Sequence, residues 1–227
     1  VQGGMGIGVS GRRLATAVAN QGGIGVLSAV GLGYLGMPCE IAAKDGESRN
    51  ITMLRQELRK MRQDTNGVIG VNIMVAIREF TETAKAAIEE GVDVIFAGAG
   101  LPLTLPACLT EGAKTKLVPI VSSAKAAKLI AKRWMSKYNY APDAFVLEGP
   151  KAGGHLGFSM EELEDPEHQL EVLLPQVVQA AQEIGADAGK QIPVIAAGGV
   201  YTGADIYHLQ QLGAAAVQMA TRFVATE

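Results

Sequence analysis

The stretch Val194-Ile-Ala-Ala-Gly-Gly-Val-Tyr-Thr-Gly-Ala-Asp-Ile-Tyr-His-Leu-Gln-Gln-Leu212, together with the run Ala216-Val-Gln-Met219 that follows it, decides the fold. It begins with a short apolar run, turns at a pair of glycines, continues as a helical pattern and returns to a second short run. Runs that are apolar on both faces are typical of strands buried in a parallel sheet. The stretch therefore predicts one strand-helix-strand unit.

The same unit repeats along the chain, which is the pattern of an α/β protein with a parallel sheet. The strands are predicted at residues 1–2, 24–28, 68–74, 92–97, 117–122, 144–148, 194–197 and 216–219. The helices between them are predicted at residues 11–21, 51–63, 80–90, 103–111, 124–137, 170–184 and 204–212. An eighth helix is expected after Phe223, and segments of the protein are expected to be missing at both ends.

Eight parallel strands can close into a TIM (β/α)8 barrel or form an open doubly wound sheet. Regular alternation without a switch signal, with glycines after many of the strands, favours the barrel. We expect one barrel domain over residues 1–227. The connections 31–50 and 149–169 are long for strand-helix loops, so each is a candidate functional loop or a mere insertion.

Composition excludes several classes of protein. The 227 residues are 48% hydrophobic with a net charge of -3, which allows one sizeable core and gives no basic footprint for nucleic acid. Cys39 and Cys108 lie far apart without the spacing of a zinc or disulfide motif, and Cys108 is expected to be buried. No run of about 18 apolar residues predicts a membrane span. A cytoplasmic protein without membrane or nucleic-acid partners fits best.

In a closed barrel the functional groups follow the carboxyl ends of the strands. Gly198-Gly199 and Ala220-Thr221 follow the last two predicted strands, where backbone amides can approach an anion closely. We predict a phosphate site there. A glycine pair can also merely permit a tight turn, but two such sites on adjacent loops favour binding.

His155 is the leading catalytic candidate. It lies in Glu148-Gly-Pro-Lys-Ala-Gly-Gly-His-Leu-Gly-Phe158, a glycine-rich loop beyond a strand end, where an imidazole can accept or donate a proton near neutral pH. The alternative is a loop histidine that only bonds to the backbone. His168 and His208 are expected to be ordinary surface or packing residues, and no pair of histidines has metal-ligand spacing. Gly31-Leu-Gly-Tyr-Leu-Gly36 matches a dinucleotide-binding pattern, but Pro38 removes the helix that such a motif requires.

Six motifs in order make the sequence resemble the nitronate monooxygenase family, formerly called 2-nitropropane dioxygenases, and the flavin-dependent enoyl-acyl-carrier-protein reductases. They are Gln2-Gly-Gly-Met5, Gly70-Val-Asn-Ile-Met74, Ala97-Gly-Ala-Gly100, Ala152-Gly-Gly-His155, Pro193-Val-Ile-Ala-Ala-Gly-Gly199 and the stretch from Gln218 to Phe223. The resemblance implies an FMN barrel with His155 as the catalytic histidine. The positions assigned to the cofactor are Gly3, Gly4, Met5, Asn72, Glu148, Gly153, Gly154, Gly198, Gly199, Gln218, Met219, Ala220 and Thr221.

The resemblance implies oxidation of small alkyl nitronates with molecular oxygen. A homodimer is the assembly that we consider for the protein. Two alternatives stay open: reduction of enoyl thioesters with NAD(P)H, and flavin binding without turnover. Two departures from the family pattern bear on this choice. Ala220 stands where glycine is frequent in the family, near the predicted phosphate. Pro150 and Lys151 replace the residues usually found before Ala-Gly-Gly-His, so the resemblance defines the substrate less closely than it defines the cofactor.

Overall fold

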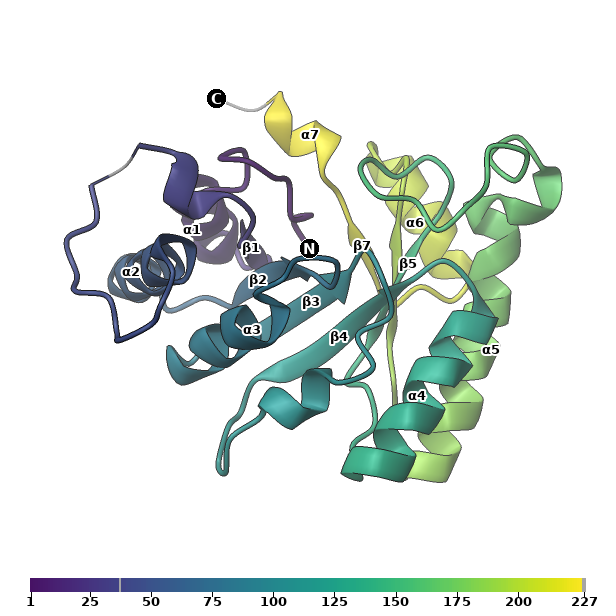
Figure 1. Ribbon diagram of the computed structural model, residues 1–227. Helices are drawn as coiled ribbons and strands as arrows, with labels where there is room; N and C mark the ends of the chain where they lie inside the picture. Colours follow the sequence, from purple (N-terminus) through teal and green to yellow (C-terminus); the bar gives the residue numbers. More distant parts are fainter. Residues whose placement is uncertain (37, 226–227) are drawn as a thin grey trace. The chain divides into compact units, whose positions relative to one another are not determined.

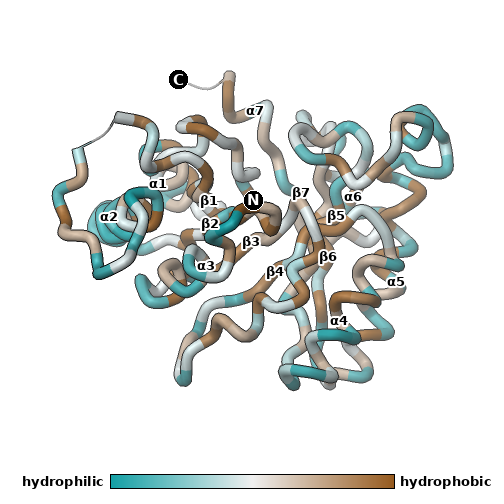
Figure 2. Tube along the Cα trace, in the orientation of Figure 1, coloured by the Kyte–Doolittle hydropathy of each residue, from teal (hydrophilic) through white to brown (hydrophobic). Residues whose placement is uncertain are grey.

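The computed structural model describes residues 1–36 and 38–225. They form two compact units, one made of Val1–Phe96 with Ala107–Lys116 and the other of Ala97–Pro106 with Leu117–Glu227. Figure 1 labels the helices and most of the strands, and Figure 2 also labels β6. In the sheet the strands follow the order β1-β2-β3-β4-β5-β6-β7, which is their order along the chain.

The first unit contains three strand-helix repeats. Its strands are β1 (Gly25–Ser28), β2 (Ile69–Met74) and the start of β3 (Val94–Gly98), and its helices are α1 (Arg12–Asn20), α2 (Arg49–Asp64) and α3 (Phe80–Glu89), with a 3-10 turn η1 (Leu32–Tyr34). β1 and β2 are parallel, with Ser28 opposite Asn72 at their carboxyl ends. The predicted strand at residues 1–2 is reduced to a bridge at Gln2, whose N–H donates to the Ile24 carbonyl at 3.1 Å.

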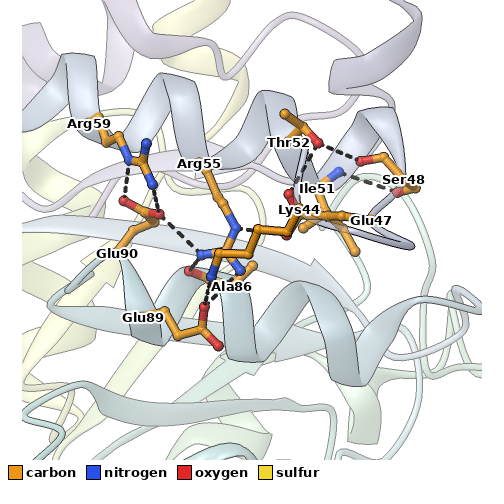
Figure 3. A network of polar contacts seen from close by, with 10 residues as sticks. All are labelled: Lys44, Glu47, Ser48, Ile51, Thr52, Arg55, Arg59, Ala86, Glu89 and Glu90. Carbon is orange, nitrogen blue, oxygen red and sulfur yellow. Dashed lines mark hydrogen bonds and ion pairs between the residues drawn. The ribbon is translucent and has the colours of Figure 1, made fainter. Parts of the chain in front are cut away.

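Helix α2 is hydrophilic along much of its length although it is largely buried (Figure 2). The polar side chains of α2 can be buried because several of them take part in an ion-pair network around Arg55, whose side chain is only 6% exposed (Figure 3). Its guanidinium contacts Glu47 at 2.8 Å, Glu89 at 2.8 Å and Glu90 at 3.1 Å. Burial lowers the pKa of Arg55, but these hydrogen bonds outweigh it, so the pKa is raised and the charge is kept. A buried cation is tolerated here because its partners surround it.

The second unit contains four more strands and four helices. The strands are β4 (Lys116–Val121, its first residue belonging to the first unit), β5 (Phe145–Glu148), β6 (Val194–Ala197) and β7 (Ala216–Gln218). The helices are α4 (Ala124–Tyr138), α5 (Leu170–Ala188), α6 (Gly203–Gln211) and the short α7 (Thr221–Val224), with a 3-10 turn η3 (Pro166–His168). β4 to β7 pair in parallel and in sequence.

Local chemistry explains the helix boundaries in the second unit. The Ser123 hydroxyl caps α4 by accepting from the Ala126 N–H, and α6 begins with a capping box in which Thr202 and Asp205 satisfy each other's backbone amides. α5 ends at Gly189, which takes the left-handed conformation at φ 65°. The core includes Trp134, the only tryptophan of the chain, which is fully buried and donates to the Pro102 carbonyl at 2.9 Å.

The predicted strands and helices are confirmed within a few residues, except at residues 1–2, where only a bridge forms, and at residues 103–111. The helix predicted at residues 103–111 is wrong, because the structure has only a 3-10 turn, η2 (Leu105–Cys108). Pro106 has no N–H to donate, and it disfavours helical backbone at Leu105 before it. The short α7 occupies part of the region where an eighth helix is predicted, and residues 226–227 lie outside the described part. Among the described residues no helix is long and apolar enough to cross a membrane.

Candidate functional site

The carboxyl ends of β5, β6 and β7 are level with one another in the second unit. Glu148 is paired with Ala197, and Ala197 with Gln218, so the loops that follow all start from one edge (Figure 1). These loops carry most of the predicted site residues. The structure therefore brings the His155 loop and the predicted phosphate loops to the same end of this unit.

Gly198 and Gly199 pack against the start of the His155 loop, at residues 149–152. Both have positive φ, 102° and 80°, a conformation that favours glycine. A Cβ at Gly198 would be 3.0 Å from the amide nitrogen of Ala152 and 3.1 Å from the carbonyl oxygen of Gly149, and one at Gly199 would be 3.2 Å from the Cβ of Lys151. The pair thus permits a turn, as the plainer interpretation holds, and also lets the His155 loop approach.

The exits of β6 and β7 also meet through two residues that the sequence analysis did not single out. The Arg222 guanidinium lies 4.8 Å from the centre of the Tyr201 ring and donates to its hydroxyl at 3.2 Å. Tyr201 follows the Gly198-Gly199 loop, and Arg222 follows Ala220 and Thr221 at the start of α7. This contact places a cation beside the predicted phosphate amides. The signal was a basic residue directly after the strand-end motif.

His155 is exposed, and its imidazole has no hydrogen-bond or ion-pair partner among residues 1–36 and 38–225. The two glycines before it have open space where a Cβ would stand. The imidazole is therefore not one of the backbone-bonded loop histidines of the alternative interpretation. It is open to solvent or to a bound molecule.

Glu148 ends β5 seven residues before His155, and its side chain is partly buried. Burial raises the pKa of this carboxyl to about 7, because the charged form loses hydration. No partner compensates for this loss in the described part of the chain. The carboxyl can thus donate or accept a hydrogen bond near neutral pH.

The other two histidines are structural or exposed, as predicted. In η3, His168 Nδ1 lies 3.0 Å from an Asp165 carboxyl oxygen, and its Nε2 lies 3.3 Å from Glu162. His208 is exposed on α6. Within the described residues no group of three or more His, Cys, Asp or Glu side chains could hold a metal ion. Cys108 is buried, as predicted, and burial raises the pKa of its thiol.

A small cavity of about 120 Å³ lies against Gly198 and Gly199 in the second unit. Lys151 and Gln169 line it on the loop side, and Asp205 and His208 line it on the α6 side. Pockets for cofactor-sized ligands measure roughly 300–1,000 Å³. The cavity by itself therefore does not accommodate a ring system, and the candidate site is the open glycine-lined edge.

The predicted residues of the first unit are held by a buried polar pair that the sequence analysis also missed. Gln2 and Ser10 are 0% and 2% exposed. The Ser10 hydroxyl accepts from the Gln2 side-chain amide at 2.7 Å and from the Met5 N–H at 2.8 Å, and it donates to the Gly3 carbonyl at 3.0 Å. Its one donor and two acceptor positions are all used. The loop Gly3-Gly4-Met5 is thus fixed by side chains instead of by a strand ladder.

Gly4 lies against Asn72 in the same unit. A Cβ at Gly4 would be 2.5 Å from the Asn72 Cγ, so a larger residue would push the Gly3–Met5 loop and the Asn72 side chain apart. Asn72 is near the end of β2 and is partly buried. The structure therefore brings Asn72 and the Gly3–Met5 loop together within the first unit, as the predicted site requires.

Comparison with known proteins identifies the family. The model of the family described as nitronate monooxygenase matches residues 1–227. A 5-hydroxy-7a-methyl-1-oxo-octahydro-1H-indene-4-carboxyl-CoA dehydrogenase from Mycobacterium tuberculosis is 31% identical over 226 residues, which cover 100% of this chain and 52% of the relative. The chain thus spans about half the length of that curated relative.

Two solved structures are similar in fold. FabK from Thermotoga maritima has a TM-score of 0.73 at 31% identity, covering 99% of this chain and 58% of that one. A nitroalkane oxidase from Streptomyces ansochromogenes has a TM-score of 0.72 at 26% identity, covering 100% and 66%. Together with the parallel strands in sequence order, these matches confirm the predicted barrel class. The chain belongs to the nitronate monooxygenase family, a family of oxidoreductases.

Proposed function

We propose that the protein is an FMN-dependent oxidoreductase that oxidises small alkyl nitronates with molecular oxygen. The observation that carries the proposal is the packing of the His155 loop against the Gly198-Gly199 pair, since an imidazole without a partner among the described residues then lies on a loop that contacts the predicted phosphate glycines. The FMN assignment itself comes from the family resemblance. Gly3, Gly4, Met5 and Asn72 are assigned to the same cofactor on that resemblance alone.

The residues of the second unit fit a phosphate-bearing cofactor chemically. Gly198 and Gly199 have no side chains to shield their amides, and Ala220 keeps its amide although it adds a methyl group. Arg222 supplies a positive charge at the same edge. Gln218, Met219 and Thr221 are proposed to complete this part of the site. When bound, the flavin would supply the electron transfer from substrate to oxygen.

The remaining chemistry falls to His155. A neutral nitroalkane must lose a proton from the carbon beside the nitro group before it can be oxidised as a nitronate. We assign that proton transfer to the His155 imidazole. Glu148, Gly153 and Gly154 are proposed to contact the cofactor beside it. A preformed nitronate already carries the negative charge and does not need this base.

Oxygen consumption by the complete, flavin-loaded protein tests the proposal. Propionate 3-nitronate and ethyl nitronate are the substrates, and free FMN at the same concentration is the control. We expect consumption well above that of free FMN. No stimulation above free FMN would exclude nitronate oxidation.

A second candidate function is oxidation or reduction of a thioester substrate. It is favoured by the 31% identity over the whole chain with a protein described as a carboxyl-CoA dehydrogenase, against 26% with the nitroalkane oxidase. An anaerobic titration separates the two. Bleaching of the flavin by NADH and its recovery with a crotonyl thioester would support the thioester reaction, whereas bleaching by a nitronate alone would support the first proposal. Absence of bleaching by both would indicate a flavin-binding protein without turnover.

A further inference from the structure

The His155 loop is attached to the second unit at two points. At its start, the Ala152 N–H donates to the Gly149 carbonyl at 3.0 Å, and the Gly149 N–H donates to the Ala197 carbonyl at 2.9 Å. At the far side of His155, the Ser122 hydroxyl donates to the Gly157 carbonyl at 3.3 Å. Only residues 153–156 lie between these attachments.

The second attachment is close enough to require glycine at position 157. A Cβ there would overlap the Ser122 hydroxyl oxygen and would be 3.0 Å from the Ser122 Cβ. Ser122 follows directly after β4, whose last residue Val121 is paired with Leu147. The attachment is therefore made to a rigid strand end at the same edge as Glu148.

The chain after Gly157 is fixed as well. The Phe158 ring meets the His168 ring edge-on at 5.9 Å, and His168 in turn lies between Glu162 and Asp165. Ser159 and Glu162 bond to each other's backbone amides at 2.7 and 3.4 Å. We expect these contacts to restrict movement of the loop as a whole and to limit the freedom of His155 to the short span 153–156.

We infer that Ser122 is a positioning residue for His155: its bond to Gly157 fixes the far end of the loop and so fixes where the imidazole stands. The inference rests on the proposed function for its catalytic consequence but not for its structural one. The Gly153-Gly154 pair would otherwise leave His155 on a flexible segment. The fixed end lowers the conformational entropy that must be lost when a base is aligned with its substrate.

The test compares Ser122→Ala with Ser123→Ala in the complete, flavin-loaded protein. Ser123 is the adjacent hydroxyl but caps α4, so its loss should lower the melting temperature without affecting the loop. Hydrogen exchange of the peptide spanning residues 153–158 is the readout that does not depend on activity. We expect exchange in that peptide to become several-fold faster in Ser122→Ala and to be unchanged in Ser123→Ala. Equal exchange in Ser122→Ala and the parent protein would overturn the inference.

Kinetics supply the second readout. Misplacing a catalytic group by about 1 Å can cost up to ~10²-fold in rate, so for Ser122→Ala we expect kcat with neutral nitroethane to fall about tenfold. With preformed ethyl nitronate we expect little change, because that substrate needs no base. A parallel fall with both substrates would overturn the positioning role. If neither nitro compound is oxidised while exchange still increases, the nitronate proposal fails and the attachment of the loop by Ser122 stands.

A pair of variants tests the contact itself. Gly157→Ala should speed exchange and slow turnover of nitroethane more than Ser122→Ala, since its methyl group would overlap the Ser122 side chain. Combining it with Ser122→Gly removes the overlap but not the loss of the hydrogen bond. We expect the double variant to recover part of the loss, to about the level of Ser122→Ala. No recovery in the double variant would contradict the proposed contact.

Discussion

Helix α2 with its surroundings and the β5–β7 loop edge treat polar side chains in opposite ways. Arg55 is buried, and three carboxylates saturate it. Glu148 and His155 have no hydrogen-bond or ion-pair partner in the described part of the chain, and Glu148 is partly buried. Saturated groups contribute to folding and offer little to a ligand, whereas groups left without partners cost stability and are available for binding or proton transfer. The difference separates the structural charges around Arg55 from the groups proposed to act at the site.

The largest expected effect is on catalysis. His155→Ala should lower kcat/KM with neutral nitroethane by about 10²–10⁴-fold, the usual contribution of a general base. The melting temperature should stay within a degree or so of the parent, because the imidazole makes no hydrogen bonds in the described structure. Steady-state kinetics and a thermal melt measure the two quantities. An unaltered kcat/KM would show that His155 is not the base.

A substitution in the Arg55 ion-pair network should affect stability instead of catalysis. Arg55→Met should destabilise the protein by about 3–5 kcal/mol, because it leaves Glu47, Glu89 and Glu90 without their shared cation. Urea unfolding measures the loss, and Arg59→Met, at an exposed side chain that contacts only Glu90 in this network, is the matched control. kcat/KM of the folded fraction should not change. A loss of activity without a loss of stability would break the distinction between the two regions.

Glu148 should make stability depend on pH. Its folded pKa of about 7 lies above the ordinary value of 4.5, so the folded state binds the proton more tightly than the unfolded chain does. The free energy of unfolding should therefore be highest below pH 4.5 for this group and fall as the pH rises through 7, by at most about 3 kcal/mol. Glu148→Gln should remove this fall, which urea unfolding between pH 5 and pH 8 measures. Glu161→Gln, at an exposed position, serves as the control.

The smallest effect is expected at the glycine pair. Gly198→Ala should cost about 1–3 kcal/mol in stability, because alanine is strained at a φ of 102° and its Cβ meets the Ala152 amide. Binding of FMN, followed by fluorescence quenching, should weaken more than binding of riboflavin, which lacks the phosphate. Gly203→Ala is the control, since a Cβ there would meet nothing within 4 Å. Equal weakening for the two flavins would argue against a phosphate site at Gly198.

The sequence predicted the elements well where periodicity and capping residues agree, as in α4 between Ser123 and Asn139. It failed at residues 103–111, where an apolar run had helical spacing but Pro106 lacks the backbone donor of a helix interior and disfavours helical angles at Leu105. The Gly198 and His155 loops could be proposed as a site from the sequence because strand-end glycines and a histidine leave a local signal. The roles of Ser10 and Arg222 were not predicted, nor was the bond between the Ser122 hydroxyl and the Gly157 carbonyl, which joins residues 35 positions apart. Such contacts follow from the tertiary structure and have no period to detect.

Trp134 offers a local optical probe. Its indole is the only one in the chain, it is fully buried, and it is hydrogen-bonded to Pro102, so both partners belong to the second unit. A shift of its emission to longer wavelength on heating or in denaturant would report water reaching that unit. Circular dichroism at the same temperature averages over all helices, α1 to α3 included. If the two signals change at different temperatures, the chain unfolds in stages. The emission then gives the temperature at which the second unit, which contains His155, unfolds.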